Sequence, residues 1–554
     1  MKNFCIAMAQ QNPIVGDIEG NLALAKKNII EAEEANADII LFSELFLCGY
    51  PTEDLVLKPS FLNKCSKAIN DIVEFSSKLN IAIIVGAPDC IAQKVYNAVY
   101  FIAQGHIVAK SHKRDLPNYA EFDEKRIFSA GDNSQIVEYK GINIALPICE
   151  DVWNMPQITK GECDIILVAN ASPYRINKTE KRLKLISNLA KKLECCVIYV
   201  NQVGGQDEMV FDGASFACNV QGDVICKLPQ FQTHIEYLNI SDNCGAQAIW
   251  YKDLEADYNA CILAVRDYVY KNGFTKCILG LSGGLDSALC AAMVCDAIGK
   301  DNLNCFMLPY VYTSQHSLDD AKKCANLLGC TYLELNISKA VEAFSSILES
   351  AFDTNNRNLW FENLQSRTRG TILMALSNKL NALLITTGNK SELATGYATI
   401  YGDMSGGFNP LKDIYKTRVY DLANWRNNNF SATFLGKKGK IIPQSIIEKP
   451  ASAELREGQK DEDSLAPYNI LDVILYELIE NDASVEQIIK KGYDKDLVKK
   501  IENLVYLAEY KRFQAAPGVR LGAKNFGTDR RYPCLLYTSP SPRDQRGSRM
   551  PSSA

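Results

Sequence analysis

The sequence predicts an α/β protein with two domains, and three observations lead to this prediction. The chain has 554 residues, of which 47% are hydrophobic, so it can fill at least two cores. Short apolar runs of strand length alternate with longer amphipathic segments in both halves. In the second half, a glycine-rich turn joins such a run to a helix-like stretch, an arrangement typical of a doubly wound parallel sheet.

The first half contains a series of β-like runs separated by lysine-rich amphipathic segments. The runs span residues 39–42, 81–85, 142–148, 165–168 and 197–200. We therefore predict an α/β domain over residues 1–245. A polar patch at 241–247 then gives way to a helical stretch at 254–270, and we assign residues 246–262 to a linker and the helix that leads into the next domain.

The second half repeats the alternation. Residues 277–281, 305–308 and 383–386 have the apolar composition of buried parallel strands, whereas 288–297 and 370–379 are helix-like, and helices are expected throughout 469–512. We predict a doubly wound domain over 263–533. Residues 534–554 abruptly become rich in Ser, Pro and Arg, as in a translated cloning adapter, and we expect a non-native, disordered tail.

Composition excludes several classes of protein. A net charge of −5 and a pI near 5.7 give no electrostatic footprint for nucleic acid, and no apolar stretch has the length of a signal peptide or a membrane span. The 19 cysteines form no C-x-x-C pair, which indicates reduced thiols in the cytoplasm. Only four histidines occur, so a Ser-His-Asp triad is not expected.

The hexapeptide 282–287, SGGLDS, is the glycine-rich turn of the second half. A strand, a glycine turn and a helix start present backbone N–H groups to a phosphate, while Ser282 and Ser287 add hydroxyl donors and Asp286 can hold Mg²⁺. The Walker pattern is absent. The motif resembles the pyrophosphate loop of the ATP pyrophosphatases; the alternative for six such residues alone is a serine-glycine turn with an N-capping aspartate.

Three potentially catalytic residues of the first half each follow a β-like run: Glu44, Lys113 and Cys149. Strand ends at one sheet edge converge, so the three can share a pocket. There, a carboxylate can act as base for the thiol while an ammonium stabilises an oxyanion. Singly, each would more often be a solvated or buried residue, but in this order their motifs resemble the Glu-Lys-Cys signature of the nitrilase superfamily, whose fold is an αββα sandwich.

That resemblance implies an amidase acting on glutamine. Cys149 would attack the amide, Glu44 would transfer the proton and Lys113 would stabilise the tetrahedral oxyanion. Glu121 corresponds to the superfamily's second acidic residue, with a surface glutamate as the alternative. The positions implied to contact glutamine are Tyr119, Glu121, Ser172 and Lys178.

Longer motifs narrow the resemblance to the glutamine-dependent NAD⁺ synthetases, over essentially residues 1–533. They span residues 362–369, 386–397, 401–404, 449–456 and 461–465. The family reaction converts deamido-NAD⁺, ATP and glutamine to NAD⁺, AMP, pyrophosphate and glutamate. The resemblance also implies a homo-oligomer, from dimer to octamer, and an internal route for ammonia.

The same resemblance assigns the second site. ATP would be held by Gly280, Leu281, Ser282, Gly283, Gly284, Leu285, Asp286, Ser287 and Thr387. Deamido-NAD⁺ would be contacted by Asn363, Glu392 and Lys511, and Mg²⁺ by Asp286 and Glu392. Arg367 and Arg369 are candidates for binding phosphate or carboxylate, or are simply solvated.

Two alternatives remain open from the residues themselves. The chain could be another glutamine amidotransferase or adenylating ligase with a different acceptor, as in GMP or asparagine synthesis. It could also be a non-catalytic nucleotide-sensing protein that has kept both sites.

Overall fold

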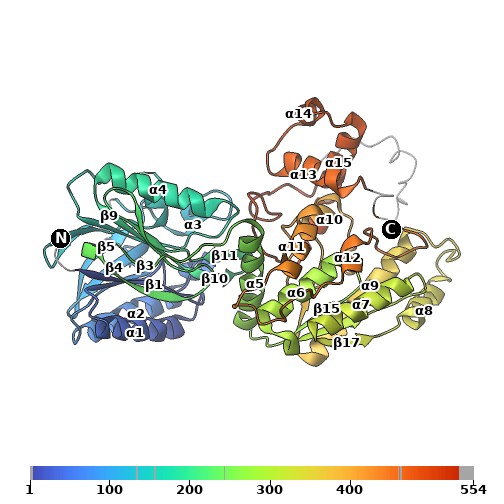
Figure 1. Cartoon of the computed structure of the whole chain (residues 1–554), viewed down its shortest axis with the longest axis horizontal. Helices are drawn as coiled ribbons and strands as arrows, with labels where there is room; N and C mark the ends of the chain where they lie inside the picture. Colours follow the sequence, from blue (N-terminus) through green and yellow to red (C-terminus); the bar gives the residue numbers. More distant parts are fainter. Residues whose placement is uncertain are drawn as a thin grey trace. The chain divides into compact units, whose positions relative to one another are not determined.

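The computed structural model describes residues 4–132, 135–154, 158–242, 244–459, 461 and 465–535 (Figure 1). Its contacts divide the chain into two compact units. The first comprises Met1–Thr275 with Val519–Leu521, and the second comprises Lys276–Gly518 and the chain from Gly522 onward. The first unit extends beyond residue 245 because helix α5 (Asp253–Lys271) packs on strands β10 (Val203–Gln206) and β11 (Met209–Asp212).

The first unit contains two six-stranded sheets. One has the order β14-β1-β2-β3-β4-β5, and its strands are β1 (Cys5–Gln10), β2 (Ile39–Leu41), β3 (Ala82–Ile91), β4 (Lys94–Ala103), β5 (His106–His112) and β14 (His234–Asn239). The other has the order β13-β12-β9-β8-β7-β6, and its strands are β6 (Ile136–Tyr139), β7 (Ile142–Ala145), β8 (Ile165–Asn170), β9 (Cys196–Asn201), β12 (Phe216–Cys218) and β13 (Val224–Lys227).

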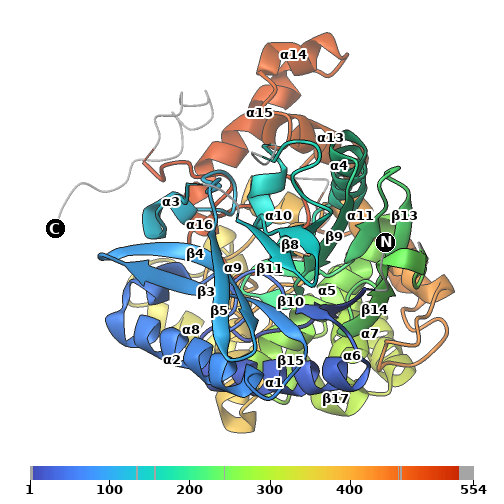
Figure 2. The same ribbon diagram turned by 90° about the vertical axis from the view of Figure 1, so that its left-hand side faces the viewer.

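Helices cover the outer faces of these two sheets (Figures 1 and 2). Helices α1 (Ile18–Glu34) and α2 (Pro59–Ser76) share a core with the first sheet, and α4 (Lys178–Leu193) shares one with the second. A third core lies between the sheets, where alternate residues such as Ile6 and Met8 meet Ile165 and Leu167. This arrangement confirms the predicted αββα sandwich.

The second unit is built on a four-stranded parallel sheet with the order β17-β16-β15-β18. Its strands are β15 (Cys277–Gly280), β16 (Leu303–Met307), β17 (Thr331–Glu334) and β18 (Leu383–Ile385). The chain moves outward from β15 to β16 and β17, then returns to place β18 on the other side of β15. The end of β15 is therefore the topological switch point, where ligands bind in open α/β sheets.

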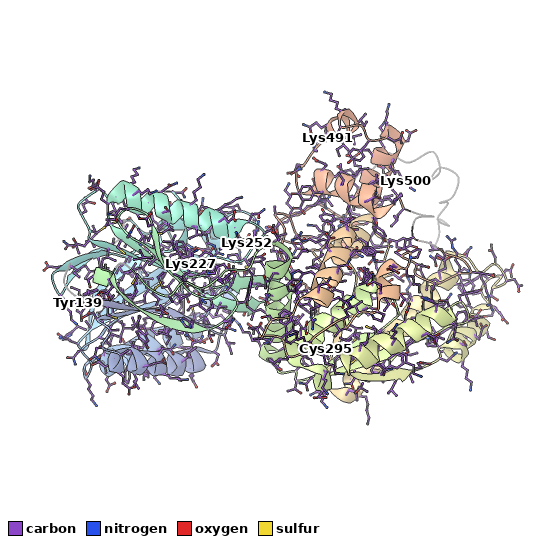
Figure 3. All side chains as sticks on the ribbon, in the orientation of Figure 1. Tyr139, Lys227, Lys252, Cys295, Lys491 and Lys500 are labelled. Atoms are coloured by element: carbon purple, nitrogen blue, oxygen red, sulfur yellow. The ribbon has the colours of Figure 1, made fainter. Side chains whose placement is uncertain are left out.

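Helices flank this sheet and continue to the C-terminal side of the chain. They are α6 (Leu285–Ile298), α7 (Gln315–Leu328), α8 (Ser338–Leu348), α9 (Leu359–Leu380), α10 (Lys390–Thr395), α11 (Lys416–Asn428), α12 (Gln444–Glu448), α13 (Tyr468–Ile479), α14 (Val485–Lys490), α15 (Lys495–Leu507) and α16 (Glu509–Arg512). Helix α6 is mostly apolar and buried, and Cys295 near its C-terminal end lies among the packed side chains of Figure 3.

Each of the 19 cysteines carries a free thiol. A search of the described helices finds none that is long and apolar enough to cross a membrane. Of the predicted tail, residues 536–554 lie outside the described residues, as do residues 462–464 of the motif at 461–465.

Candidate active sites

The predicted Glu-Lys-Cys group lies at the ends of three strands in the first unit. Glu44 follows β2 and Lys113 directly follows β5, both in one sheet, whereas Cys149 begins a short 3₁₀ turn (Cys149–Val152) after β7 of the other sheet. Lys113 Nζ lies 2.7 Å from Glu44 Oε1. The Cys149 thiol interacts electrostatically with both residues. The group therefore forms, but from two sheets and not from the single sheet edge that we expected.

Glu44 is fully buried and fixed by three hydrogen bonds. Its Oε1 accepts from Lys113 Nζ and from Asn97 Nδ2, each at 2.7 Å, and its Oε2 accepts from the backbone N–H of Ala171 at 3.0 Å. Three donors thus hold both carboxylate oxygens of Glu44 in a fixed orientation. Glu44 is thus a buried, oriented base next to a thiol.

Lys113 has a second carboxylate partner, Glu124. Lys113 Nζ donates to Glu124 Oε1 at 2.7 Å, and the Tyr50 hydroxyl donates to the same oxygen at 2.7 Å. Burial alone would lower the Lys113 pKa, but Glu124 and Glu44 together raise it well above its usual range. Burial, reinforced by Glu44, raises the pKa of Glu124 to about 7 against the pull of Lys113. Lys113 therefore stays charged while it faces the thiol.

Sequence matching pointed to Glu121 for this acidic position, and Glu124 escaped notice. Glu124 begins the short helix α3 (Glu124–Ile127), eleven residues after Lys113. Glu124 is buried in the structure, but the sequence did not indicate this, because a charged residue at a helix start is ordinarily solvated.

The turn that carries Cys149 is held by one carboxylate. Asp151 accepts hydrogen bonds from the backbone N–H groups of Ile148 at 2.9 Å, Arg114 at 3.0 Å and Asp115 at 2.8 Å. It thereby joins the Cys149 turn to the segment that follows Lys113. Burial and the charge of Glu44 raise the pKa of the Cys149 thiol well above its usual range. Deprotonation of the thiol therefore requires a base, and Glu44 is the neighbour that can serve.

The four predicted glutamine contacts all belong to the first unit. Tyr119 donates its hydroxyl to Glu150 Oε1 at 2.9 Å, and both line a cavity of about 650 Å³. Ser172 is buried, and its backbone N–H donates to Asn201 Oδ1 at 2.8 Å. Burial and the charges of Arg182 and Arg175 lower the pKa of Lys178 to about 8. Lys178 and Tyr119 both interact electrostatically with Cys149.

Glu121, the fourth of these residues, is held by arginines. Its Oε2 pairs with Arg175 Nη2 and lies 3.4 Å from Nη2 of Arg520. Glu121 also interacts electrostatically with Lys178. It therefore belongs to the charged lining around Lys178 and does not contact Lys113 in the way that Glu124 does.

The loop at 281–284 has the expected form of a phosphate cradle in the second unit. Ser287 Oγ accepts from the Ser282 N–H at 3.2 Å and donates to the Gly284 carbonyl at 3.0 Å, which closes the turn over the start of α6. Gly283 has φ +77°, and a Cβ there would lie 2.3 Å from the Ser317 carbonyl oxygen. Only glycine fits, and the backbone N–H groups at the helix start favour an anion.

Two acidic residues flank this loop. Asp286 Oδ1 accepts from Asn389 Nδ2 at 3.0 Å, and its Oδ2 pairs with Lys416 Nζ. Burial and the charge of Asp286 raise the pKa of Glu392 well above its usual range. Two carboxylates held together with a single lysine are hard oxygen donors that a divalent cation would stabilise. Lys416 was not found from the sequence because its partner Asp286 is 130 positions away.

A cavity of about 530 Å³ joins the predicted residues of the second unit. The loop residues from Gly280 to Ser287 other than Gly283 line it, together with Thr387, Asn363, Glu392 and Lys511. Arg367 and Arg369 also line it and donate their Nε–H groups to the Ile400 and Leu308 carbonyls. All the residues predicted from separate motifs thus face one cavity, apart from Gly283, which shapes the loop.

Two protein families match this chain, one in each half. The carbon-nitrogen hydrolase family matches residues 5–248, and the NAD synthase family matches residues 257–515. The glutamine-dependent NAD⁺ synthetase of Rhodobacter capsulatus is 42% identical over 545 residues, which cover 96% of this chain and 98% of that protein. The chain belongs to the glutamine-dependent NAD⁺ synthetases.

Other members of this synthetase family agree. The glutamine-dependent NAD⁺ synthetase of Acinetobacter baylyi is 42% identical over 97% of this chain and 99% of that protein. The structure of the Acinetobacter baumannii synthetase in complex with ADP has a TM-score of 0.77 at 38% identity, covering 96% of this chain and 98% of that one. The Cytophaga hutchinsonii synthetase, at 23% identity and a TM-score of 0.83, shows the same fold over 97% of this chain and 98% of that one.

Within this synthetase, Asn363 and Lys511 are held by their own surroundings. Asn363 Oδ1 accepts from Thr399 Oγ1 at 3.0 Å, and Lys511 Nζ donates to the Gly396 and Ala398 carbonyls at 2.7 and 2.8 Å. Burial lowers the pKa of Lys511 and lowers that of Arg369 to about 10. Fixed, desolvated cations of this kind favour a ligand that carries phosphate or carboxylate groups.

Proposed function

We propose that this chain hydrolyses glutamine at Cys149 and uses the ammonia to convert adenylated deamido-NAD⁺ to NAD⁺, with ATP giving AMP and pyrophosphate. One observation carries the proposal: a buried Glu44–Lys113 pair beside a nucleophilic thiol occurs on the same chain as a phosphate loop that opens into a large cavity. The relatives that match nearly the whole chain are named for this activity.

The first half-reaction uses the residues around Cys149. As Cys149 Sγ attacks the side-chain amide carbon of glutamine, Glu44 takes the thiol proton, and the oxyanion that forms is stabilised by the Lys113 ammonium. Glu44 returns the proton to the amide nitrogen, the C–N bond breaks, and ammonia leaves a thioester. Water then attacks the thioester with Glu44 again as base, releasing glutamate and the thiol.

The second half-reaction takes place over the loop at 280–287. The nicotinate carboxylate attacks the α-phosphorus of ATP, the bond to the β-phosphate oxygen breaks, and pyrophosphate leaves. Backbone N–H groups at the α6 start stabilise the phosphate charge, with Thr387 beside them. Ammonia then attacks the acyl carbon and AMP leaves. Mg²⁺, held by Asp286 and Glu392, would neutralise phosphate charge when bound.

The acceptor is recognised by fixed polar groups of the same cavity. Asn363, Glu392 and Lys511 are the residues that we assign to deamido-NAD⁺, and Arg367 and Arg369 lie where they can pair with its phosphates. A sensor without catalysis would not need a nucleophile, base and oxyanion donor held together in the first unit. The geometry therefore favours the enzyme over the nucleotide-sensing alternative.

We also place the enzyme in the cytoplasm as a homo-oligomer that acts on small molecules. The 19 free thiols support a reducing compartment. The family relationship supports self-association, which sedimentation velocity of the purified chain would measure directly.

The test is NAD⁺ formation with glutamine and, in parallel, with ammonium as nitrogen donor. Wild type should use both, and Cys149→Ala should lose glutamine while keeping ammonium. If the correctly folded variant loses both activities, the two half-reactions are not divided as proposed. If wild type forms no NAD⁺ but releases pyrophosphate with another carboxylate, the acceptor is wrong.

A further inference from the structure

Three residues from near the C-terminal end of the chain are counted with the first unit. Val519–Leu521 belong to it, although Gly518 and Gly522 on either side belong to the second unit. The backbone N–H of Arg520 donates to the Glu208 carbonyl at 3.0 Å, and the Leu521 carbonyl accepts from the Ile176 N–H at 3.0 Å. We call residues 517–522 the strap. Its centre is therefore an integral, hydrogen-bonded part of the glutamine-hydrolysing unit.

The side chain at the centre of the strap reaches a predicted glutamine contact. Nη2 of Arg520 lies 3.4 Å from Glu121 Oε2, and the two side chains are only 4% and 2% exposed. Arg175 pairs with the same oxygen. The other oxygen, Glu121 Oε1, is buried and has no hydrogen-bond partner among the described residues. A buried carboxylate with one unmet acceptor is costly unless a ligand supplies the donor.

The strap also fixes the segment that bears two further glutamine contacts. Ile176, which donates to the strap, lies between Ser172 and Lys178. Arg175 next to it bonds Glu121, and Lys178 interacts electrostatically with Glu121. One short segment thus orders both the carboxylate and the loop around it.

The two ends of the strap are anchored within the second unit. The Asn409 N–H donates to the Pro517 carbonyl at 2.8 Å, and the Gly522 N–H donates to Asp413 Oδ2 at 2.6 Å. Asn409 in turn donates its side-chain amide to the carbonyl of Gly388, which lines the nucleotide cavity. Arg520 therefore lies on a backbone segment whose ends are held by hydrogen bonds to Asn409 and Asp413.

We propose that Arg520 is a positioning residue for glutamine, an inference that rests on the proposed function. Together with Arg175 it holds Glu121 so that Oε1 is left to accept from a cationic group of the substrate, and glutamine carries one such group, its α-ammonium. Residues 1–275 alone are then an incomplete glutaminase, since the second guanidinium on Glu121 comes from residue 520.

The experiment uses the full-length chain and the kinetics of glutamine hydrolysis. Arg520→Met removes one buried ion pair to Glu121 and should raise KM for glutamine about tenfold, with kcat within about twofold. Arg520→Lys, which keeps the charge, should restore part of the loss. Ammonium-driven NAD⁺ formation should not change in either variant. Arg531→Met, which replaces an exposed arginine beyond the strap, should behave as wild type.

A double-mutant cycle separates positioning from general destabilisation. Glu121→Gln should raise KM by itself, and adding Arg520→Met should have little further effect because the two residues act through one contact. Any of three results would overturn the proposal. They are an unchanged KM in Arg520→Met, additive effects in the double variant, and a fall in kcat alone in proportion to unfolded protein. Absence of glutamine hydrolysis in wild type would instead refute the proposed function.

Discussion

The substitution Gly283→Ala tests whether the loop before α6 holds the nucleotide phosphates. Gly283 has φ +77°, and its added Cβ would lie 2.3 Å from the Ser317 carbonyl oxygen, where contacts below 3.0 Å essentially never occur. Ser317 lies in the first turn of α7 and is buried, so its backbone cannot easily yield. The loop itself must move.

The size of the effect follows from two separate costs. An alanine in this left-handed conformation costs about 1–2 kcal/mol of stability. Relief of the clash needs a displacement of roughly 1 Å, and a misplacement of that size can cost about 100-fold in rate, or about 2.7 kcal/mol of barrier. We therefore expect ammonium-driven NAD⁺ formation to fall about 100-fold in kcat/KM for ATP, while glutamine hydrolysis persists.

Gly329→Ala is the matched control. Gly329 ends α7 with φ +75°, and its Cβ would also meet an atom at 2.3 Å, but that atom is the flexible Nζ of Lys437. The two variants should lose similar thermal stability, and only Gly283→Ala should lose nucleotide-dependent activity. If both variants keep full activity, or both lose it equally, the loop does not bind the phosphates in the way we describe.

Two further predictions concern buried charge. The pKa of Glu124 is raised to about 7, so near neutral pH the native state keeps a proton that the unfolded chain releases. The free energy of unfolding should therefore fall by about 3 kcal/mol as pH rises from about 4.5 to about 7. Glu124→Gln should lack this slope, so its unfolding temperature should gain on wild type between about pH 5 and about pH 8; parallel curves would contradict the assignment. Lys416→Met leaves Asp286 and Glu392 without their ammonium, which should cost about 3–5 kcal/mol. Mg²⁺ should then raise the unfolding temperature more in this variant than in wild type, and an equal shift would remove these carboxylates from the metal site.

Sequence reasoning located a residue correctly where it comes directly after a strand. Glu44, Lys113 and the 282–287 loop come after apolar runs, and hydrophobic patterning locates strand ends within a few residues. The two-domain α/β architecture was predictable for the same reason. The division of the chain at Thr275 was not, because it depends on how α5 packs against β10 and β11.

Residues defined by distant partners could not be predicted. Glu121 and Glu124 lie three positions apart, and only the path of the chain decides which of them reaches Lys113. Lys416 and Arg520 are ordinary basic residues in the sequence, and their roles come from carboxylates far away along the chain. Periodicity reports which face of an element is buried and carries no information about such pairings.

The environment of Cys149 has a consequence for the resting enzyme. Burial and the charge of Glu44 raise the pKa of the Cys149 thiol well above its usual range, and peroxides and alkylating electrophiles react with the thiolate form of a cysteine. We therefore expect the Cys149 thiol to react slowly with such reagents between turnovers. In a protein with 19 cysteines, the nucleophile that we propose is thus expected to resist oxidative damage while the enzyme rests.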